Sequence, residues 1–366
     1  MFLQEITINE FRNLINIKFK AEKGLNIIIG ENGQGKTSLL EAIHFLATGI
    51  SFRTSDQQVL LSYDHDKFRI EGLYQIGDRV MRSLIIYDRN KGKKFFLNEK
   101  KKSLLEQEIK IVLFTPDDLY IIKGPPKKRR LMIDNGLKNI SKEYYQYLDT
   151  YTKLLKKRNF LLQTEQVNSK IFTALNQAFV EQSAKVLLAR LNYINFLDEV
   201  LPKIYEKINP GKGTIKIKYA LSFPLDNDKI NIDILNRKME EQLILMTEVE
   251  KKRKKTLTGP HIDDLHIYAD GKMARQYCSQ GQQRSIILAL KLAEMESAAK
   301  IKGQYPLFFL DEVLAELDEG KRENLLDYLE KAPFQSFLTT VNTEYIKNVK
   351  KAQVNFINQG ALFRKE

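Results

Sequence analysis

The spacing of apolar residues divides the chain into three zones. In the first zone, up to about residue 120, short apolar runs bounded by Gly or Asn alternate with polar positions, which predicts strands such as 25–29. One helix is predicted inside this zone, because Leu39, Ile43 and Leu46 recur at a spacing of three to four. The third zone, from about 256, returns to short apolar runs separated by amphipathic segments. Both ends of the chain therefore have the pattern of a sheet with helices.

The middle zone, from about 125 to 255, has the period of amphipathic helices. Tyr144, Tyr147 and Tyr151 recur at this period, with charged residues between them. We expect the aromatic stripe to form helix core, and a base-stacking surface is the alternative. A short strand is predicted at 212–222, where Gly and Pro interrupt the pattern. About 130 residues folded as two antiparallel arms span less than ~100 Å, so a compact arm is predicted.

The order of the zones favours one α/β domain that is split by a helical insertion. In the third zone we expect a helix at 279–300, a buried strand at 307–310 and a strand at 336–341. The predicted sheet domain, or head, consists of residues 1–122 and 256–366, and residues 123–255 form the α-helical arm.

Composition narrows the class of protein. The 366 residues are 43% hydrophobic and 29% charged, which excludes wholesale disorder. The single cysteine, Cys278, excludes an intrachain disulfide and a multi-cysteine zinc site. We expect a cytoplasmic protein, because the chain has neither a signal-peptide pattern nor an apolar run long enough to span a membrane. The formal net charge of +13 favours a polyanionic partner, such as nucleic acid.

One motif predicts a phosphate-binding loop. The pattern G-x-x-x-x-G-K-[ST] follows a predicted strand and opens a predicted helix, which is the context that a nucleotide triphosphate loop requires. Glycines let backbone amides converge on phosphate oxygens, the lysine contacts the β- and γ-phosphates, and the threonine hydroxyl ligates Mg²⁺. A glycine-rich turn without a ligand is the alternative. The candidate ATP-binding residues are Gly30, Glu31, Asn32, Gly33, Gln34, Gly35, Lys36, Thr37 and Ser38.

Two acids follow the predicted strand at 307–310. In parallel sheets, ligands bind beyond the carboxyl ends of the strands. We therefore expect Asp311 to hold Mg²⁺ together with Thr37, and Glu312 to act as the general base that polarises the attacking water. An acidic pair in this position is also common as a helix cap.

A second anion-binding helix start is predicted at Ser279, Gly281 and Gln282. Hydroxyl, bare backbone amides and helix dipole all favour an anion there. Because the chain already has one phosphate loop, this second site suggests that it contacts the nucleotide of another copy, which predicts an ATP-dependent homodimer. Asp318 follows the acidic pair Asp311 and Glu312 after five residues, and it could simply cap the next predicted helix.

These motifs together resemble the head of ATP-binding-cassette (ABC) ATPases, the class shared by transporters, Rad50 and the structural-maintenance-of-chromosomes proteins. Ser279 to Gln283 resembles the signature motif of that class, and Asp318 resembles its D-loop aspartate. The resemblance implies an ABC-type P-loop ATPase head with Lys36, Asp311 and Glu312 as catalytic residues.

Further segments resemble the RecF family of bacterial DNA replication and repair proteins over essentially the whole chain. They are 9–13, 114–119, 123–126, Arg129–Arg130 and 258–265. The resemblance implies an ATP-dependent dimer on double-stranded DNA and on double-strand/single-strand junctions at gaps. It also implies that the protein works with RecR and RecO to load the recombinase and that it supports the SOS response. From the same resemblance, Arg12 and Asn13 are expected to contact the nucleotide, and a solvent-facing Arg12 is the alternative.

The chain departs from these families at three places. Ile262 stands where RecF sequences usually carry Arg, and Asp117 is the candidate substitute for the Q-loop glutamine. The switch histidine is replaced by Thr339 and Thr340, of which Thr340 is expected to contact the γ-phosphate. Since a hydroxyl is a weaker general acid/base than histidine, we expect slow hydrolysis and therefore a weak ATPase.

Two basic runs bracket the predicted arm, so we expect both near its base, in contact with DNA phosphates. Such contacts are independent of sequence and sensitive to salt. Solvated surface charge is the alternative. The residues are Lys127, Lys128, Arg129 and Arg130 in the first run, and Lys251, Lys252, Arg253, Lys254 and Lys255 in the second.

Three functions remain open from the sequence. The first is a DNA-stimulated ATPase that acts as a clamp. The second is the ATPase subunit of a transporter, which the long insertion and the missing switch histidine disfavour. The third is a non-catalytic scaffold that only senses ATP, against which Glu312 argues.

Overall fold

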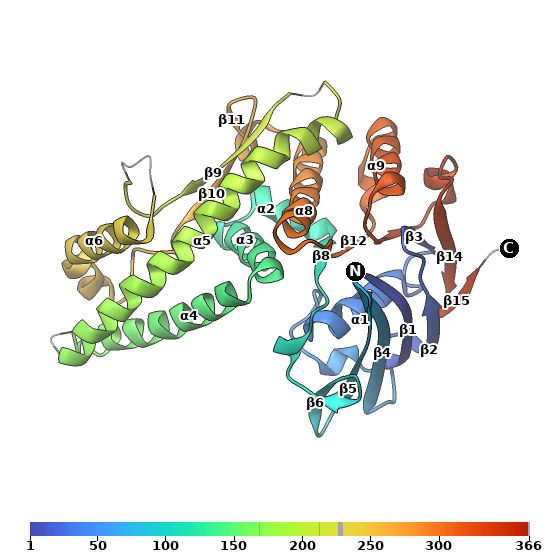
Figure 1. Ribbon diagram of the computed structural model, residues 1–366, viewed down its shortest axis with the longest axis horizontal. Helices are drawn as coiled ribbons and strands as arrows, with labels where there is room; N and C mark the ends of the chain where they lie inside the picture. The colour runs from blue at the N-terminus through green and yellow to red at the C-terminus, as the bar shows by residue number, and fades with distance from the viewer. Residues whose placement is uncertain (168, 212, 226–229, 365–366) are drawn as a thin grey trace. The chain divides into compact units, whose positions relative to one another are not determined.

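The computed structural model describes residues 1–167, 169–211, 213–225 and 230–364, and it divides the chain into two compact units (Figure 1). Unit 1 comprises Met1–Asp118, Lys207–Gly211 and Glu294–Glu366, and unit 2 comprises Leu119–Glu206 and Lys212–Ala293. The first boundary lies within a few residues of the predicted one. The last boundary falls at 293 rather than 255, because the strand that follows the arm pairs with a strand inside it.

A mostly parallel sheet in unit 1 confirms the α/β prediction. Its strand order is β15-β14-β3-β13-β12-β8, and only β15 is antiparallel to its neighbour. The predicted buried strand lies between two parallel neighbours and is covered on both faces, which is why it is continuously apolar. The bounds are β3 Leu25–Ile29, β8 Ile111–Phe114, β12 Leu307–Leu310, β13 Ser336–Thr340, β14 Ala352–Asn358 and β15 Ala361–Arg364.

Unit 1 also contains an antiparallel sheet, and helix α1 (Lys36–Thr48) packs between the two sheets. The core cluster joins residues of both sheets, such as Ile6 and Phe309, to Leu39 and Leu40 of α1. The antiparallel order is β2-β1-β4-β5-β6-β7. The bounds are β1 Phe2–Phe11, β2 Leu14–Lys20, β4 Lys67–Ile76, β5 Arg79–Asp88, β6 Gly92–Leu97 and β7 Lys100–Lys101, and the C-terminal part of the unit adds helix α9 Glu319–Lys331.

Unit 2 is mainly helical, as the middle zone predicts. Tyr144 and Tyr151 of the aromatic stripe are buried, which confirms that they belong to the core. The helices are α2 Tyr120–Lys123, α3 Pro126–Ile140, α4 Lys142–Gln163, α5 Lys170–Ile208, α6 Ile232–Arg253, α7 Ala274–Tyr277 and α8 Gln280–Lys302, of which α5 and α8 continue into unit 1. Short 3₁₀ helices across the chain are η1 Gln58–Leu60, η2 Leu104–Glu106, η3 Pro116–Leu119, η4 Val313–Glu316 and η5 Thr343–Ile346.

A three-stranded antiparallel sheet in unit 2 has the order β11-β10-β9. Its strands are β9 Ile215–Ala220, β10 Asp264–Ala269 and β11 Lys272–Met273. The strand predicted at 212–222 is therefore confirmed as β9, while Lys212 lies outside the described residues. Because β9 belongs to the arm and β10 follows it in sequence, their pairing draws the segment after residue 255 into unit 2.

Buried ion pairs hold the helices of unit 2 together. Arg158 of α4 donates to Glu250 of α6 at 2.6 Å, and both side chains are almost fully buried. Arg190 of α5 lies 2.8 Å from Asp134 of α3 and also donates to the backbone oxygen of Pro260. Buried charges of this kind need such partners, because an unpaired charge in the interior is very costly. No helix in the described part of the chain is long and apolar enough to cross a membrane.

Candidate nucleotide-binding site

The loop between β3 and α1 has a backbone that requires glycine. Gly33 and Gly35 have φ values of 81° and 115°, in the left-handed region. At Gly30, a Cβ would lie 2.5 Å from the backbone oxygen of Ile357 in β14. Gly33 and Gly35 thus allow the turn of the loop, whereas Gly30 allows the close approach of β14.

The loop is held from outside by polar contacts. Asn13 donates from Nδ2 to the backbone oxygen of Gly33 at 3.2 Å. The backbone N–H of Gly360 donates to the oxygen of Gln34 at 3.0 Å. The expectation for Asn13 was contact with the nucleotide, and the structure places its amide against the phosphate-binding loop itself.

Lys36 is buried and directed back into its own loop. Its Nζ donates to the backbone oxygens of Gly30 and Glu31 at 2.9 and 3.0 Å, and it lies 3.4 Å from Oε1 of Glu312. The helix α1 that begins at Lys36 has no side-chain cap at its N-terminus. Free amides at a helix N-terminus, a positive helix dipole and an ammonium group together form a good environment for phosphate.

Asp311 and Glu312 extend this site from the end of β12. Thr37 donates from Oγ1 to Oδ1 of Asp311 at 3.0 Å, and Thr339 of β13 donates to the same oxygen at 2.8 Å. The hydroxyl of Thr339 also accepts the backbone N–H of Glu312 at 2.9 Å. Burial raises the pKa of Asp311 above its usual value, although the two hydroxyl donors act in the opposite direction.

The residue of β13 that reaches the acids is Thr339, which the sequence interpretation did not choose. Thr340, which is expected to contact the γ-phosphate, exchanges hydrogen bonds with the backbone of Asn342, and its contact with phosphate stays a prediction. Successive residues of a strand point to opposite faces, so only one of the two threonines can face the acidic pair that follows β12. The choice between them depends on strand register, which the sequence does not show.

The oxygen donors present fit a magnesium ion that is completed by phosphate and water. Thr37 and Asp311 already lie within hydrogen-bond distance, and they are the hydroxyl and carboxylate ligands that Mg²⁺ commonly takes in triphosphate sites. Among the described residues there is no cluster of three or more histidine, cysteine or acidic residues that would form an all-protein metal cage. Such a sparse ligand set is typical of a metal that arrives with its nucleotide.

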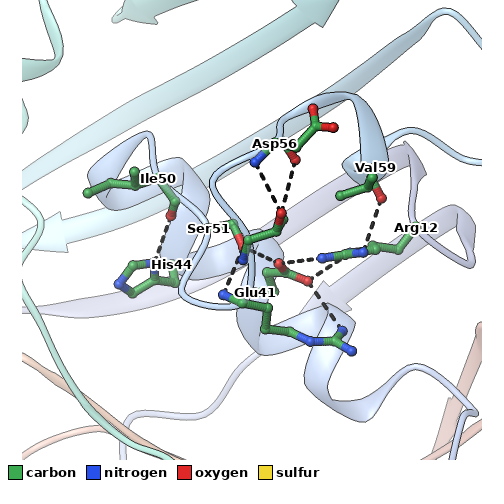
Figure 2. Close-up of polar contacts among 9 residues, drawn as sticks. Arg12, Glu41, His44, Ile50, Ser51, Asp56 and Val59 are labelled. Atoms are coloured by element: carbon green, nitrogen blue, oxygen red, sulfur yellow. Dashed lines mark hydrogen bonds and ion pairs between the residues drawn. The ribbon is translucent and has the colours of Figure 1, made fainter.

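Arg12 belongs to a polar cluster around Glu41, shown in Figure 2. Glu41 lies on α1, one turn after Thr37, and its carboxylate is fully buried. Arg12 donates to both of its oxygens at 2.9 Å and to the backbone oxygen of Val59 at 3.0 Å (Figure 2). Arg53 lies 3.5 Å from the same carboxylate. The structure therefore places Arg12 as a support of α1, and its contact with nucleotide stays a prediction.

The motif at the start of α8 lies in unit 2. Ser279 Oγ accepts the backbone N–H of Gln282 at 3.3 Å, and Gln282 Oε1 accepts the backbone N–H of Ser279 at 2.8 Å. These reciprocal contacts are a capping box, and both side chains remain exposed. Asp318, which lies in unit 1, accepts the N–H of Lys321 at 3.0 Å and so caps α9, the alternative that the sequence left open.

The two basic runs do not lie together, contrary to expectation. In the first run, Arg129 is 4% exposed and its guanidinium is bound by Asp264 at 2.6 and 2.9 Å, so it is not available to DNA. The second run begins in the last turn of α6, and Lys254, directly after the helix, pairs with Glu165 beyond the far end of α4. Both runs lie at the ends of the predicted arm in the sequence, but this does not bring them together in space. After residue 255 the chain still runs from the end of α6 back to β10.

A glycine-rich loop that precedes a helix between two sheets, facing an acidic pair at the end of another parallel strand of the same sheet, defines the head of an ABC-type ATPase. The profile described as RecF/RecN/SMC N terminal domain matches residues 2–361, and the chain belongs to this family. It is 34% identical to the DNA replication and repair protein RecF of Enterococcus faecalis, over 100% of this chain and 99% of the relative. For the RecF of Staphylococcus epidermidis the identity is 37%, with 100% of both chains covered.

Solved structures agree with this assignment. The structure of the recombination mediator protein RecF with ATP, from the RecFOR pathway, superposes with a TM-score of 0.88 at 31% identity and covers 100% of this chain and 98% of that chain. An Smc head bound to the C-winged helix domain of ScpA superposes with a TM-score of 0.60 at 17% identity, covering 99% and 96%. The second comparison shows that the ABC-type head fold extends beyond close relatives.

Proposed function

We propose that this protein is an ATP-dependent DNA-binding clamp that acts in recombinational repair and replication restart. The observation that carries the proposal is the contact of Lys36 and Thr37 with the acidic pair Asp311 and Glu312. The proposal is supported by the relatives, which are named DNA replication and repair proteins, and by the similar solved structures of RecF in the RecFOR pathway. The transporter alternative has no comparable support.

ATP is the proposed substrate, and its phosphates replace the present partners of Lys36. The amides at the start of α1 bind phosphate oxygens, and Lys36 moves from the loop carbonyls to the β- and γ-phosphates. Thr37 and Asp311 would hold Mg²⁺, which would neutralise phosphate charge. Glu312 accepts the proton of the attacking water as general base.

The second half of the proposed site comes from another copy of the chain. Ser279, Gly281 and Gln282 are exposed or partly exposed at the start of α8, where the helix dipole favours an anion. We propose that they contact the γ-phosphate of the partner's nucleotide, and that Asp318 also contributes to the nucleotide site. Thr339 and Thr340 in place of a histidine leave Glu312 as the main base of the reaction, so hydrolysis is slow and the ATP-bound dimer is long-lived.

DNA is the proposed polyanion, at double-strand/single-strand junctions of gaps. Arg129 is left out of the proposed contacts because it is buried. Lys251 and Lys254 already form ion pairs with carboxylates and are weaker candidates. Bound at such a junction, the clamp would work with RecR and RecO to load the recombinase and would support SOS induction. The remaining candidate contacts are Lys127, Lys128, Arg130, Lys252, Arg253 and Lys255.

Sedimentation velocity of the full chain, with and without ATP and duplex DNA and at low and high salt, tests the proposal. We expect a dimer only with ATP, and DNA co-sedimentation that decreases steeply with salt. Lys36→Met is expected to lose nucleotide binding and the dimer together. A dimer that forms equally without ATP, or in Lys36→Met, would overturn the proposed ATP-dependent clamp.

A further inference from the structure

The solvent face of the sheet in unit 2 carries basic and aromatic side chains in register. In β9, Ile215, Ile217 and Tyr219 are buried, so the alternate residues Lys216 and Lys218 are on the opposite, exposed face. The antiparallel register pairs Lys216 with Tyr268 and Lys218 with His266 of β10. Directly paired residues project to the same face, so these four side chains form one surface, which we call the sheet surface.

The positive charge of the sheet surface is not neutralised within the described part of the chain. Neither Lys216 nor Lys218 forms an ion pair with a carboxylate there. The acidic residue of β10 on the same face, Asp264, is bound through both carboxylate oxygens by Arg129. Uncompensated lysines on one side of a flat sheet attract a polyanion.

The same Arg129–Asp264 pair extends the basic surface to helix α3. Because Arg129 is bound to the end of β10, the first turn of α3 lies beside that end of the sheet. Lys127 and Lys128 in this turn are exposed. The charge therefore continues from the strands to the helix, which gives Arg129 a positioning role although it is itself buried.

Two rings accompany the lysines on the sheet surface. His266 and Tyr268 have ring centroids 6.3 Å apart at an interplanar angle of 78°, and both side chains are partly exposed. Lysines beside aromatic rings are typical of surfaces that bind single strands, because unpaired bases stack on the rings while the lysines bind phosphates. Bases of a duplex are already stacked on one another, so a duplex would use only the lysines.

We propose that the sheet surface, with Lys127 and Lys128, binds single-stranded nucleic acid. This inference rests on the proposed function and adds to it, since it assigns the unpaired strand of a junction to a particular surface of the chain. The sheet surface lies outside both basic runs of the sequence, and the register of β9 with β10 is what creates it.

The test is fluorescence anisotropy of the full-length protein with a labelled oligo(dT) strand and a labelled duplex, each of about 20 nucleotides, over a range of salt concentrations. For oligo(dT), we expect the slope of log K against log salt to become shallower by about 1.4 in Lys216→Ala/Lys218→Ala, from about 0.7 for each lost phosphate contact. Tyr268→Ala should weaken oligo(dT) binding by at least about fivefold while duplex binding is nearly unchanged. The matched control, Lys91→Ala/Lys94→Ala, removes the same charge from exposed positions in unit 1 and should change neither value.

Thermal unfolding and ATP-dependent sedimentation of each variant establish that it is folded. Equal oligo(dT) affinity in wild type, Tyr268→Ala and Lys216→Ala/Lys218→Ala would overturn the inference and leave the proposed clamp intact. An equal loss of oligo(dT) and duplex binding in Tyr268→Ala would also overturn it, because stacking of unpaired bases could not be the cause. A wild-type protein that binds neither probe would overturn the DNA-binding function as well.

Discussion

Nζ of Lys36 lies 3.4 Å from Oε1 of Glu312, so the ammonium of the phosphate-binding loop is paired with the acid that follows β12. Glu312 itself has a left-handed backbone, with φ of 52°, and its side chain is about 40% exposed. The two groups on which the proposed chemistry depends are thus already adjacent. Phosphates that draw Lys36 away would free the carboxylate of Glu312 to accept a proton from water.

The first prediction concerns this carboxylate. Glu312→Gln keeps the shape of the side chain but removes the base, so we expect hydrolysis to slow by roughly 10²–10⁴-fold. The ATP-bound dimer should persist for correspondingly longer in sedimentation or light scattering. Glu319→Gln, an exposed position in α9, is the matched control and should behave as wild type. A dimer of Glu312→Gln that dissociates at the wild-type rate would favour the non-catalytic scaffold.

The second prediction separates the two threonines of β13. Thr339→Val removes the hydrogen bonds to Asp311 and to the backbone of Glu312. Since the hydroxyl donor lowers the pKa of Asp311, its loss should raise that pKa further and weaken Mg²⁺-dependent nucleotide binding by roughly tenfold. Titration with Mg²⁺-ATP at several pH values measures this, and a higher pH should recover part of the affinity. Thr340→Val is the control, and a larger defect there would return the role to Thr340.

The third prediction addresses the second half-site. Ser279→Arg places a long charged side chain at the start of α8. This position is far in sequence from the chain's own phosphate-binding loop, and it belongs to unit 2 whereas the loop belongs to unit 1. We expect ATP binding to stay within about threefold of wild type and the ATP-dependent dimer to be lost. Ser279→Thr retains a capping hydroxyl and should still dimerise. If Ser279→Arg dimerised normally, the motif would act only as a helix cap.

The fourth prediction concerns the cluster around Glu41. Its carboxylate is fully buried and receives both donors of Arg12, so Glu41→Gln leaves an arginine without its charge partner. Removal of one partner of a buried ion pair is expected to lower the free energy of unfolding by about 3 kcal/mol, measured by urea denaturation. Glu31→Gln, in the exposed part of the loop, should change stability by less than about 0.5 kcal/mol. Equal stabilities would show that the Arg12–Glu41 pair is dispensable.

The fifth prediction follows from His261. Its Nδ1 lies 2.5 Å from the hydroxyl of Tyr151, and burial, with the nearby charges of Arg130, Arg158 and Arg190, lowers its pKa from 6.5 to about 4. The unfolded chain therefore binds a proton between pH 6.5 and 4 that the folded chain does not, so the protein loses stability as pH falls through this range.

The measurement is urea denaturation at pH 7.5 and pH 5. Over that interval we expect a loss of about 2 kcal/mol from His261, at ~1.4 kcal/mol for each pH unit below the unfolded pKa. His261→Gln cannot take up the proton, and its stability should decrease by about that much less over the same interval. Identical pH dependence in both proteins would show that His261 titrates normally in the folded state.

The sequence by itself determined the elements whose chemistry is local. The loop at 30–37 directly follows its strand and directly precedes its helix, so the sequence predicted both the motif and its structural context. The four apolar residues at 307–310 predicted a strand buried on both faces, and the acids after it were placed by the general rule for parallel sheets. The helical arm could be predicted because apolar residues recur with a period of about 3.6 over long segments.

Only the tertiary structure decided the rest. The register of β13 with β12 places Thr339, and not Thr340, against the acidic pair. The pairing of β9 with β10 extends unit 2 beyond residue 255 and brings Lys216 and Lys218 beside the rings of His266 and Tyr268. The buried contact with Asp264 removes Arg129 from a run of basic residues that looks uniform in sequence. In each case the deciding partner is distant along the chain, and composition and period carry no information about which distant segments pack against each other.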